Sequence, residues 1–314
     1  MMAKMLCAYY DKSCDSRELF KGLKIAEDPS FEKHLNKYNV LYLDVTSFTT
    51  QAELRGHIVK SIQEEMIEEI KSAFPNVTYK TTMDLMGCLQ AIYNQTGERF
   101  YFIIDEWDAI CREFPERRKY KDSPSSVEPT EMDEYVLFLR RLFKSQASEE
   151  VFVGAYLTGI LPMVKYNTES ALNNFREYSM TTPGPMGGFL GFNDDDVKML
   201  SEKYHMDFSE LKRWYDGYEM DTFDWRINAP DIKKTAIYNP NSVMTAIRAR
   251  RCDNYWAQSE AFDSLQRYID NDFNGVKETL EKLIKGEPVR INVLRFGNDM
   301  NDVSDNEELF TLLI

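Results

Sequence analysis

Paired cysteines and long apolar runs are both missing from this sequence. The five cysteines, at positions 7, 14, 88, 111 and 252, are odd in number, scattered and never spaced as metal-binding knuckles. Neither a disulfide framework nor a zinc site is therefore expected. The longest apolar stretches, such as 151–160, are too short to cross a bilayer, and the first residues lack the apolar centre and cleavage site of a secretion signal. We expect a cytoplasmic protein with no membrane partner.

Positive charge is in the minority. The chain has 38 Lys and Arg against 52 Asp and Glu, a formal net charge of −14. An acidic molecule of this size repels a phosphate backbone unless its positive charge is concentrated locally, so direct nucleic-acid binding is disfavoured. The run RARR at 248–251, with Tyr255 and Trp256 as stacking partners, is a weak candidate. Basic residues at a helix end more often complement the helix dipole.

The apolar residues alternate between helical and strand patterns. With 43% hydrophobic residues in 314 positions, the chain can bury two moderate cores, so two domains are expected. Helical spacing begins at Met1, and it recurs between three apolar runs rich in β-forming residues. The expected strands are 39–48, 100–104 and 151–161, and the expected later helices include 54–70, 83–94 and 132–145. This alternation predicts an α/β domain over residues 1–190, with a mostly parallel sheet and flanking helices.

The pattern changes after segment 181–192, which has two prolines and four glycines. Short helices are expected to begin at Asn193, at Ser209 and near Ser242, and 288–294 is the one strong strand candidate. Residues 191–314 are therefore predicted to be a mainly helical region, for which a winged-helix fold is one alternative. Segment 114–131 is polar and contains prolines, and it is expected to be an exposed loop.

Two adjacent carboxylates follow the second expected strand, in the stretch RFYFIIDEWDA (99–109). Nucleotide-hydrolysing enzymes end a buried parallel strand in an Asp that holds Mg²⁺, beside a Glu that orients and deprotonates water. Asp105 and Glu106 have this order, and Asp108 follows within the same turn. Consecutive strand side chains point to opposite faces, so the two roles require the chain to turn here. The alternative is a core strand that simply exits into an acidic loop.

A polar residue also ends the third expected strand. In FVGAYLTGI, Thr158 occupies the sequence position at which such enzymes place a residue that senses the γ-phosphate. Taken alone, its hydroxyl is better explained as a cap of a backbone group. Together, the acid pair and the hydroxyl define one edge of a parallel sheet, at the carboxyl ends of its strands, where open α/β sheets bind ligands.

Five separated segments resemble one family. They are FYFIIDEWDAICREF, AYLTGILPM, NNFREYSMTTPGPMGGFLGF, WYDGYEM and IYNPNSVMTAI. In this order they are similar to the predicted AAA-ATPase-like family, bacterial proteins whose P-loop ATPase domain is often followed by a restriction-endonuclease-like nuclease domain. The resemblance implies a P-loop NTPase-like fold that uses ATP and Mg²⁺, and an output to a protein partner or an attached nuclease.

The resemblance also implies roles for single residues. Asp105 would coordinate Mg²⁺, Glu106 would act as the catalytic base, and Thr158 would sense phosphate. Asp108 matches the acidic pattern of the family and is expected to bind the cofactor. WYDGY (214–218) and YNPNS (238–242) have no implied role, and we expect aromatic packing around a helix stop at Gly217 and a turn at Pro240.

The phosphate-binding loop of the family is missing from these residues. No G-x-x-x-x-G-K-[ST] motif is present, and the glycines at 184, 187, 188 and 191 lack the following Lys and Ser. Truncation is the favoured explanation, because the chain begins at the expected loop helix and ends on an uncapped apolar stretch; a substitute segment or a closed-up sheet are the alternatives.

Two functions stay open. The first is the core of an ATP-binding and ATP-hydrolysing switch module, which is expected to be weak or inactive without the loop, because the lysine and loop amides hold the phosphates. The second is a non-catalytic protein-interaction scaffold derived from an ATPase.

Overall fold

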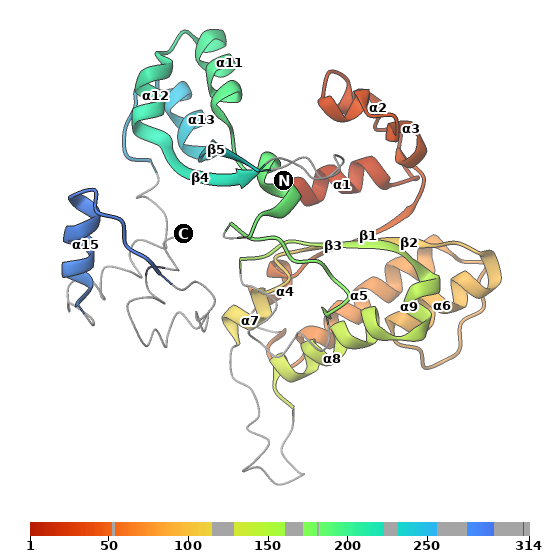
Figure 1. Ribbon diagram of the computed structural model, residues 1–314. Coiled ribbons are helices and arrows are strands. Elements are labelled where there is room, and N and C mark those ends of the chain that lie inside the picture. The colour runs from red at the N-terminus through yellow and green to blue at the C-terminus, as the bar shows by residue number, and fades with distance from the viewer. Residues whose placement is uncertain are drawn as a thin grey trace. The chain divides into compact units, whose positions relative to one another are not determined.

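The computed structural model describes residues 1–51, 54–114, 129–160, 172–180, 182–222, 232–255, 275–291 and 310 (Figure 1). The chain divides into two compact units, Met1–Arg176 and Glu177–Ile314, and each is described by itself. The first unit ends ahead of position 190, where the composition of the sequence changes. Within the described ranges, no helix has the length and apolar character needed to span a membrane.

A parallel sheet forms the centre of the first unit. Its strands are β1 (Asn39–Asp44), β2 (Phe100–Asp105) and β3 (Phe152–Leu157), in the order β1-β2-β3. The register places Asp44 opposite Asp105 and Ile104 opposite Leu157. All three strands begin within the predicted apolar runs, although the first ends at Asp44 and not at residue 48, where helix α4 (Thr46–Thr49) already runs. The predicted α/β fold with a mostly parallel sheet is confirmed.

Helices cover both faces of this sheet. In Figure 1, α5, α6, α8 and α9 lie on one side of the strands and α1 lies on the other. The helices of this unit, with one 3₁₀ turn η1, are α1 (Met2–Tyr10), α2 (Arg17–Phe20), η1 (Lys24–Glu27), α3 (Phe31–His34), α4 (Thr46–Thr49), α5 (Ile58–Ala73), α6 (Leu85–Thr96), α7 (Ala109–Glu113), α8 (Glu131–Lys144) and α9 (Gln146–Val151).

The long helices follow ordinary sequence signals. Helix α5 buries Ile58, Ile62, Met66 and Ile70, while the glutamates of its other face are exposed. Helix α6 begins at an Asp84 cap and ends at a glycine with φ of 74°, and a capping box of Thr130 and Asp133 begins α8. Each fully buried aliphatic side chain stabilises the fold by roughly 1.5–3 kcal/mol relative to an exposed one.

The two faces of β2 differ in character. Phe100, Phe102 and Ile104 belong to the main hydrophobic core. Tyr101 and Ile103 alternate with them and point to the α1 side, where the ring of Tyr101 stacks on Tyr10 with centroids 4.2 Å apart. Asp105 continues this second series and is directed by the pleat to the α1 side as well.

The second unit combines helices with a small antiparallel sheet. Strands β4 and β5 pair with each other, and a bridge joins Phe192 to Tyr238. The elements are η4 (Gly184–Phe189), α11 (Asp194–Tyr204), α12 (Phe208–Tyr215), β4 (Asp216–Thr222), β5 (Lys233–Tyr238), α13 (Pro240–Ala249) and α15 (Val276–Ile284). The winged-helix alternative stays a prediction.

Strands β4 and β5 correct the sequence interpretation. Helix α12 ends at Tyr215 and the chain enters β4 directly, so Gly217 is a strand residue and not a helix stop. Most of β4 is exposed, so it lacks the apolar alternation by which a strand is recognised. Helix α12 also begins after a cap at Asp207, not at Ser209.

Two of the helix starts that the sequence predicts in the second unit are confirmed. Asn193 caps α11, as predicted, and Pro240 opens α13 after an Asn239 cap. Within RARR, Arg250 donates to the Tyr204 carbonyl and Arg251 pairs with an aspartate. Residues 288–291 are not in a strand. Three parts of the sequence predictions lie outside the described residues: positions 292–294 of the strand candidate, positions 115–128 of the expected loop, and Trp256.

Candidate active site at the carboxyl edge of the parallel sheet

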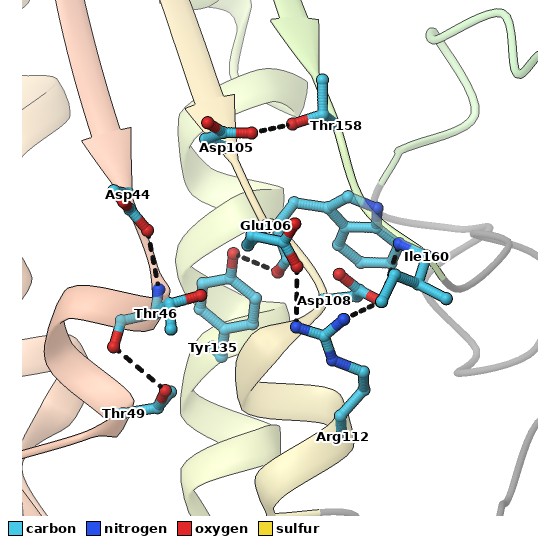
Figure 2. Close-up of polar contacts among 11 residues, drawn as sticks. Asp44, Thr46, Thr49, Asp105, Glu106, Asp108, Arg112, Tyr135, Thr158 and Ile160 are labelled. Carbon is cyan, nitrogen blue, oxygen red and sulfur yellow. Dashed lines mark hydrogen bonds and ion pairs between the residues drawn. The ribbon is translucent and has the colours of Figure 1, made fainter. Parts of the chain in front are cut away.

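The carboxyl ends of the three parallel strands present polar side chains at one edge (Figure 2). Asp44 ends β1, Asp105 ends β2, and Thr158 follows β3. Backbone hydrogen bonds continue across these ends, because Val45 N–H donates to the Asp105 carbonyl at 3.1 Å and Thr158 N–H donates to the Ile104 carbonyl at 2.9 Å. The side chains therefore project from a backbone held on both sides.

Asp105 and Thr158 are in direct contact. The Thr158 hydroxyl donates a hydrogen bond to Oδ1 of Asp105, and the Tyr42 hydroxyl lies 3.4 Å from Oδ2 of the same carboxylate. Burial and then the charge of Asp105 raise the pKa of Tyr42 to about 12. Tyr42 is thus a protonated donor at neutral pH. Burial followed by the Asp105 charge also raises the pKa of Tyr156.

The chain turns sharply at Glu106. This residue has a φ of 52°, in the left-handed region that non-glycine residues rarely adopt. The turn is held from both sides, because Trp107 N–H donates to the Thr158 carbonyl at 2.9 Å and the buried Tyr135 hydroxyl donates to the Trp107 carbonyl at 2.7 Å. The turn that the predicted roles of the acid pair require is therefore present.

Glu106 and Asp108 meet at one arginine. Nη2 of Arg112 donates to Glu106 Oε2 at 2.8 Å, and Nη1 lies 3.7 Å from Asp108 Oδ2. Asp108 has no exposed surface and accepts a hydrogen bond from Ile160 N–H at 3.1 Å. A cofactor that reached Asp108 would have to displace these neighbours. Its predicted role in cofactor binding stays a prediction.

Gly159 allows the two turns to approach each other. A Cβ at this position would lie 2.5 Å from Cδ1 of Trp107 and 2.6 Å from Oδ1 of Asp108. Real Cβ atoms do not tolerate such distances, so any other residue would push the segment after β3 away from the segment after β2.

A pocket of about 580 Å³ opens beside Asp105. Its lining residues come from the strand ends, from α1 and from α2: Met1, Lys4, Met5, Ala8, Leu19, Phe20, Asp44 and Asp105. The pocket thus joins the acidic strand ends to the beginning of a nine-residue helix. The amide groups of a helix N-terminus and the ammonium of Lys4 both favour a negatively charged ligand.

Comparison with known proteins places the chain in a family. A family model described as predicted AAA-ATPase matches residues 1–168. The chain belongs to the predicted AAA-ATPase family. No curated protein and no solved structure matches it. Membership of the predicted AAA-ATPase family suggests, in general terms, the use of nucleotide and Mg²⁺.

The donor set at the strand ends fits a magnesium ion of the kind that an ATPase uses. Mg²⁺ is typically bound by one or two carboxylates, with water and substrate phosphates completing the shell. Asp105 and Asp44 are opposite each other in register and line the same pocket. In the described part of the chain no three His, Cys, Asp or Glu residues form a cluster able to hold a metal. A magnesium ion here would therefore depend on bound phosphates.

Sequence reasoning missed three residues of this candidate site. Asp44 ends VLYLD much as Asp105 ends FYFIID, so the parallel register could have paired them. Arg112 follows Asp108 by four residues, a spacing that joins charges on a helix. Lys4 has no sequence signal that separates it from an ordinary surface lysine.

Proposed function

We propose that this chain is the core of an ATP-binding and ATP-hydrolysing switch module whose site is the carboxyl edge of the parallel sheet. The observation that carries the proposal is the hydrogen bond from Thr158 to Asp105, with Glu106 in a left-handed turn directly beside it. A hydroxyl and two carboxylates at adjacent strand ends, next to a pocket at a helix N-terminus, suit the recognition of a metal-bound phosphate.

Each residue takes a separate role in this proposal. Asp105 would hold Mg²⁺, and the ion would supply positive charge that neutralises the phosphates. Thr158 senses the γ-phosphate through the hydroxyl that now contacts Asp105. Glu106 accepts a proton from the attacking water as the water oxygen bonds to the γ-phosphorus and ADP leaves. A positioned general base contributes roughly 10²–10⁴-fold to a rate.

Binding is expected to be weak in the 314 residues. No G-x-x-x-x-G-K-[ST] loop is present, and hydrogen bonds to charged groups stabilise by roughly 1.5–3 kcal/mol each. Lys4 lines the pocket and would supply positive charge toward the phosphates. We therefore expect a Kd for Mg-ATP nearer to about 1 mM than to about 1 μM, a difference of roughly 4.1 kcal/mol.

Equilibrium dialysis with Mg-ATP, combined with a turnover assay, tests the proposal. The wild-type chain is expected to bind ATP in a Mg²⁺-dependent manner, and D105N is expected to remove that dependence. E106Q is expected to keep binding and to lose turnover. E64Q is the control, because Glu64 lies on the exposed face of α5, where it forms an ion pair with Lys60 at 3.7 Å. Equal turnover in wild type and E106Q would contradict the role of Glu106.

The second candidate is a non-catalytic interaction scaffold that has kept the ATPase fold. Two observations favour it: the missing phosphate loop, and the apolar wall of the pocket, to which Met1, Met5 and Leu19 contribute. Micromolar binding of Mg-ATP by the wild-type chain would count against this scaffold. In either case the output would be a protein partner or, in longer relatives, an attached nuclease domain.

A further inference from the structure

Arg112 connects the proposed base to the segment that carries Thr158. Its guanidinium lies between the carboxylates of Glu106, at 2.8 Å, and Asp108, at 3.7 Å (Figure 2). Asp108 in turn accepts a hydrogen bond from the backbone of Ile160, two residues after Thr158. Glu106 therefore contacts Arg112, Arg112 contacts Asp108, and Asp108 contacts the backbone of Ile160.

We propose that Arg112 is a positioning residue for Glu106, anchored through Asp108 to the backbone after Thr158. The inference rests on the proposed function, because it takes Glu106 to be the general base. A general base is more effective when a further group fixes its orientation, as in the nucleophile–base–orienter arrangement. Arg112 occupies the orienting position.

The exposure of the side chains supports this order. Glu106 is 39% exposed, so water reaches a side chain that one hydrogen bond from Arg112 restrains. Arg112 is only 23% exposed and Asp108 is fully buried, so the arginine is held more firmly than the glutamate. A planar guanidinium with several fixed donors can contact two carboxylates at once, which the single ammonium of a lysine does less well.

The anchor also joins the base to the proposed phosphate sensor. The Thr158 carbonyl accepts from Trp107 N–H, and Ile160 N–H donates to Asp108. Residues on both sides of Gly159 are thus bonded to the two residues that follow Glu106. A shift of the Thr158 segment toward a phosphate would move Asp108 and Arg112, and with them the carboxylate of Glu106.

Turnover of Mg-ATP by variants of the full chain tests the inference. R112A is expected to lower kcat by about tenfold or more, while the Kd for Mg-ATP stays within about twofold. R112K is expected to recover part of the lost kcat, because lysine restores the positive charge but not the planar set of donors that contacts two carboxylates. The E106Q/R112A double mutant should show no more than the residual turnover of E106Q alone, since Arg112 acts through Glu106.

The matched control is R141A. This change removes another arginine–carboxylate pair of the same unit, Arg141 with Asp84 at 2.6 Å, which lies away from the strand ends on α8 and the α6 cap. It is expected to leave kcat unchanged. Unfolding midpoints of all variants separate a folding defect from a catalytic one, and R112Q replaces R112A if the latter fails to fold.

A nucleotide-free measurement separates this inference from the proposed function. The Nε–H signal of Arg112, assigned in ¹⁵N spectra by its loss in R112K, is expected to shift and to exchange faster with water in E106Q. An unchanged signal would contradict the inference alone. So would a kcat for R112A equal to wild type, or a turnover of the double mutant above the residual turnover of E106Q. Absence of Mg-ATP binding by the wild-type chain would instead contradict the proposed function.

Discussion

The hydroxyl of Thr158 donates a hydrogen bond to the carboxylate of Asp105 across the β2–β3 pair, although 53 positions separate the two residues in the sequence. The parallel register and the backbone bond from Thr158 N–H to the Ile104 carbonyl bring them together. The proposed magnesium ligand is thereby oriented by the proposed phosphate sensor. A substitution of Thr158 should therefore alter the contacts that Asp105 makes.

Removal of the Thr158 hydroxyl should impair turnover more than stability. T158V keeps the shape of the side chain but leaves Asp105 without this donor, so turnover of Mg-ATP is expected to fall about tenfold, in line with the loss of one hydrogen bond to a charged group. T158S keeps the hydroxyl and should retain most of the activity. Turnover measured across a Mg²⁺ titration checks both variants. Equal rates for T158V and T158S would contradict the contact.

The left-handed backbone at Glu106 should make a glycine variant more stable than an alanine variant, which is the reverse of the usual order of stability in a helix. Both E106A and E106G lose the ion pair with Arg112, so their difference reports the backbone alone. At a φ of 52° an alanine is strained, and E106G is expected to be the more stable by about 1 kcal/mol. Denaturant unfolding measures this difference.

A residue in an ordinary right-handed helix is the control for the comparison of alanine with glycine at position 106. At Glu68, on the exposed face of α5, E68A should be more stable than E68G by about 1 kcal/mol. The same order of stability at both sites would show that residue 106 does not hold the left-handed conformation in solution.

Gly159 should tolerate no side chain. The Cβ in G159A would meet Trp107 at 2.5 Å and Asp108 at 2.6 Å, so a cost of about 1–3 kcal/mol in the free energy of unfolding is expected. G188A, in the second unit, is the control because, apart from its own neighbours along the chain, no heavy atom of the described residues lies within 4 Å of its Cβ. A G159A variant as stable as wild type would show that the turns after β2 and β3 leave room for a side chain at this position.

Much of the first unit could be predicted because its elements are specified locally. Buried parallel strands are continuous apolar runs, as in residues 100–104, and helices such as α5 repeat their apolar residues at helical spacing. The carboxyl ends of such strands then fix where Asp105 and Thr158 lie. The location of the candidate site therefore follows from patterns that need no tertiary information.

The details of the site depend on tertiary contacts. The left-handed turn at Glu106 has no local cause, since a glutamate does not favour it; bonds from Trp107 to Thr158 and from Tyr135 to Trp107 impose it. The pairing of Arg112 with Glu106 depends on that turn. Strand β4 was missed for a related reason, because pairing with β5 and not an apolar pattern makes it a strand.

Asp194 organises a polar cluster in the second unit that should respond to acid. Its carboxylate accepts hydrogen bonds from the buried Tyr238 hydroxyl and from Lys212 Nζ, at 2.9 Å in the latter case. The bond from Tyr238, followed by the bond from Lys212, lowers the pKa of Asp194 below its ordinary value of 3.8. The cluster ties the first turn of α11 to α12 and β5.

The sign of the pH effect follows from the lowered pKa. The stabilisation is complete above the unfolded value of 3.8 and is lost as pH falls through the lower folded value. Y238F should therefore reduce the Tm at neutral pH, and its difference from wild type should shrink as pH falls from about 6 toward 3. Because the Asp194 side chain is 46% exposed, solvent screens the effect and a small change is expected.

Y215F is the matched control for this measurement. The Tyr215 hydroxyl donates to the Asp253 carbonyl at 2.9 Å and accepts from the Asp253 amide at 3.0 Å, and it also contacts the thiol of Cys252. The backbone groups do not titrate, and burial raises the pKa of the Cys252 thiol above its ordinary value of 9.0, so the Tm cost of Y215F should be the same from neutral to acid pH. If the costs of Y238F and Y215F ran parallel from neutral to acid pH, the ionised Asp194 would have no special share in holding α11, α12 and β5 together.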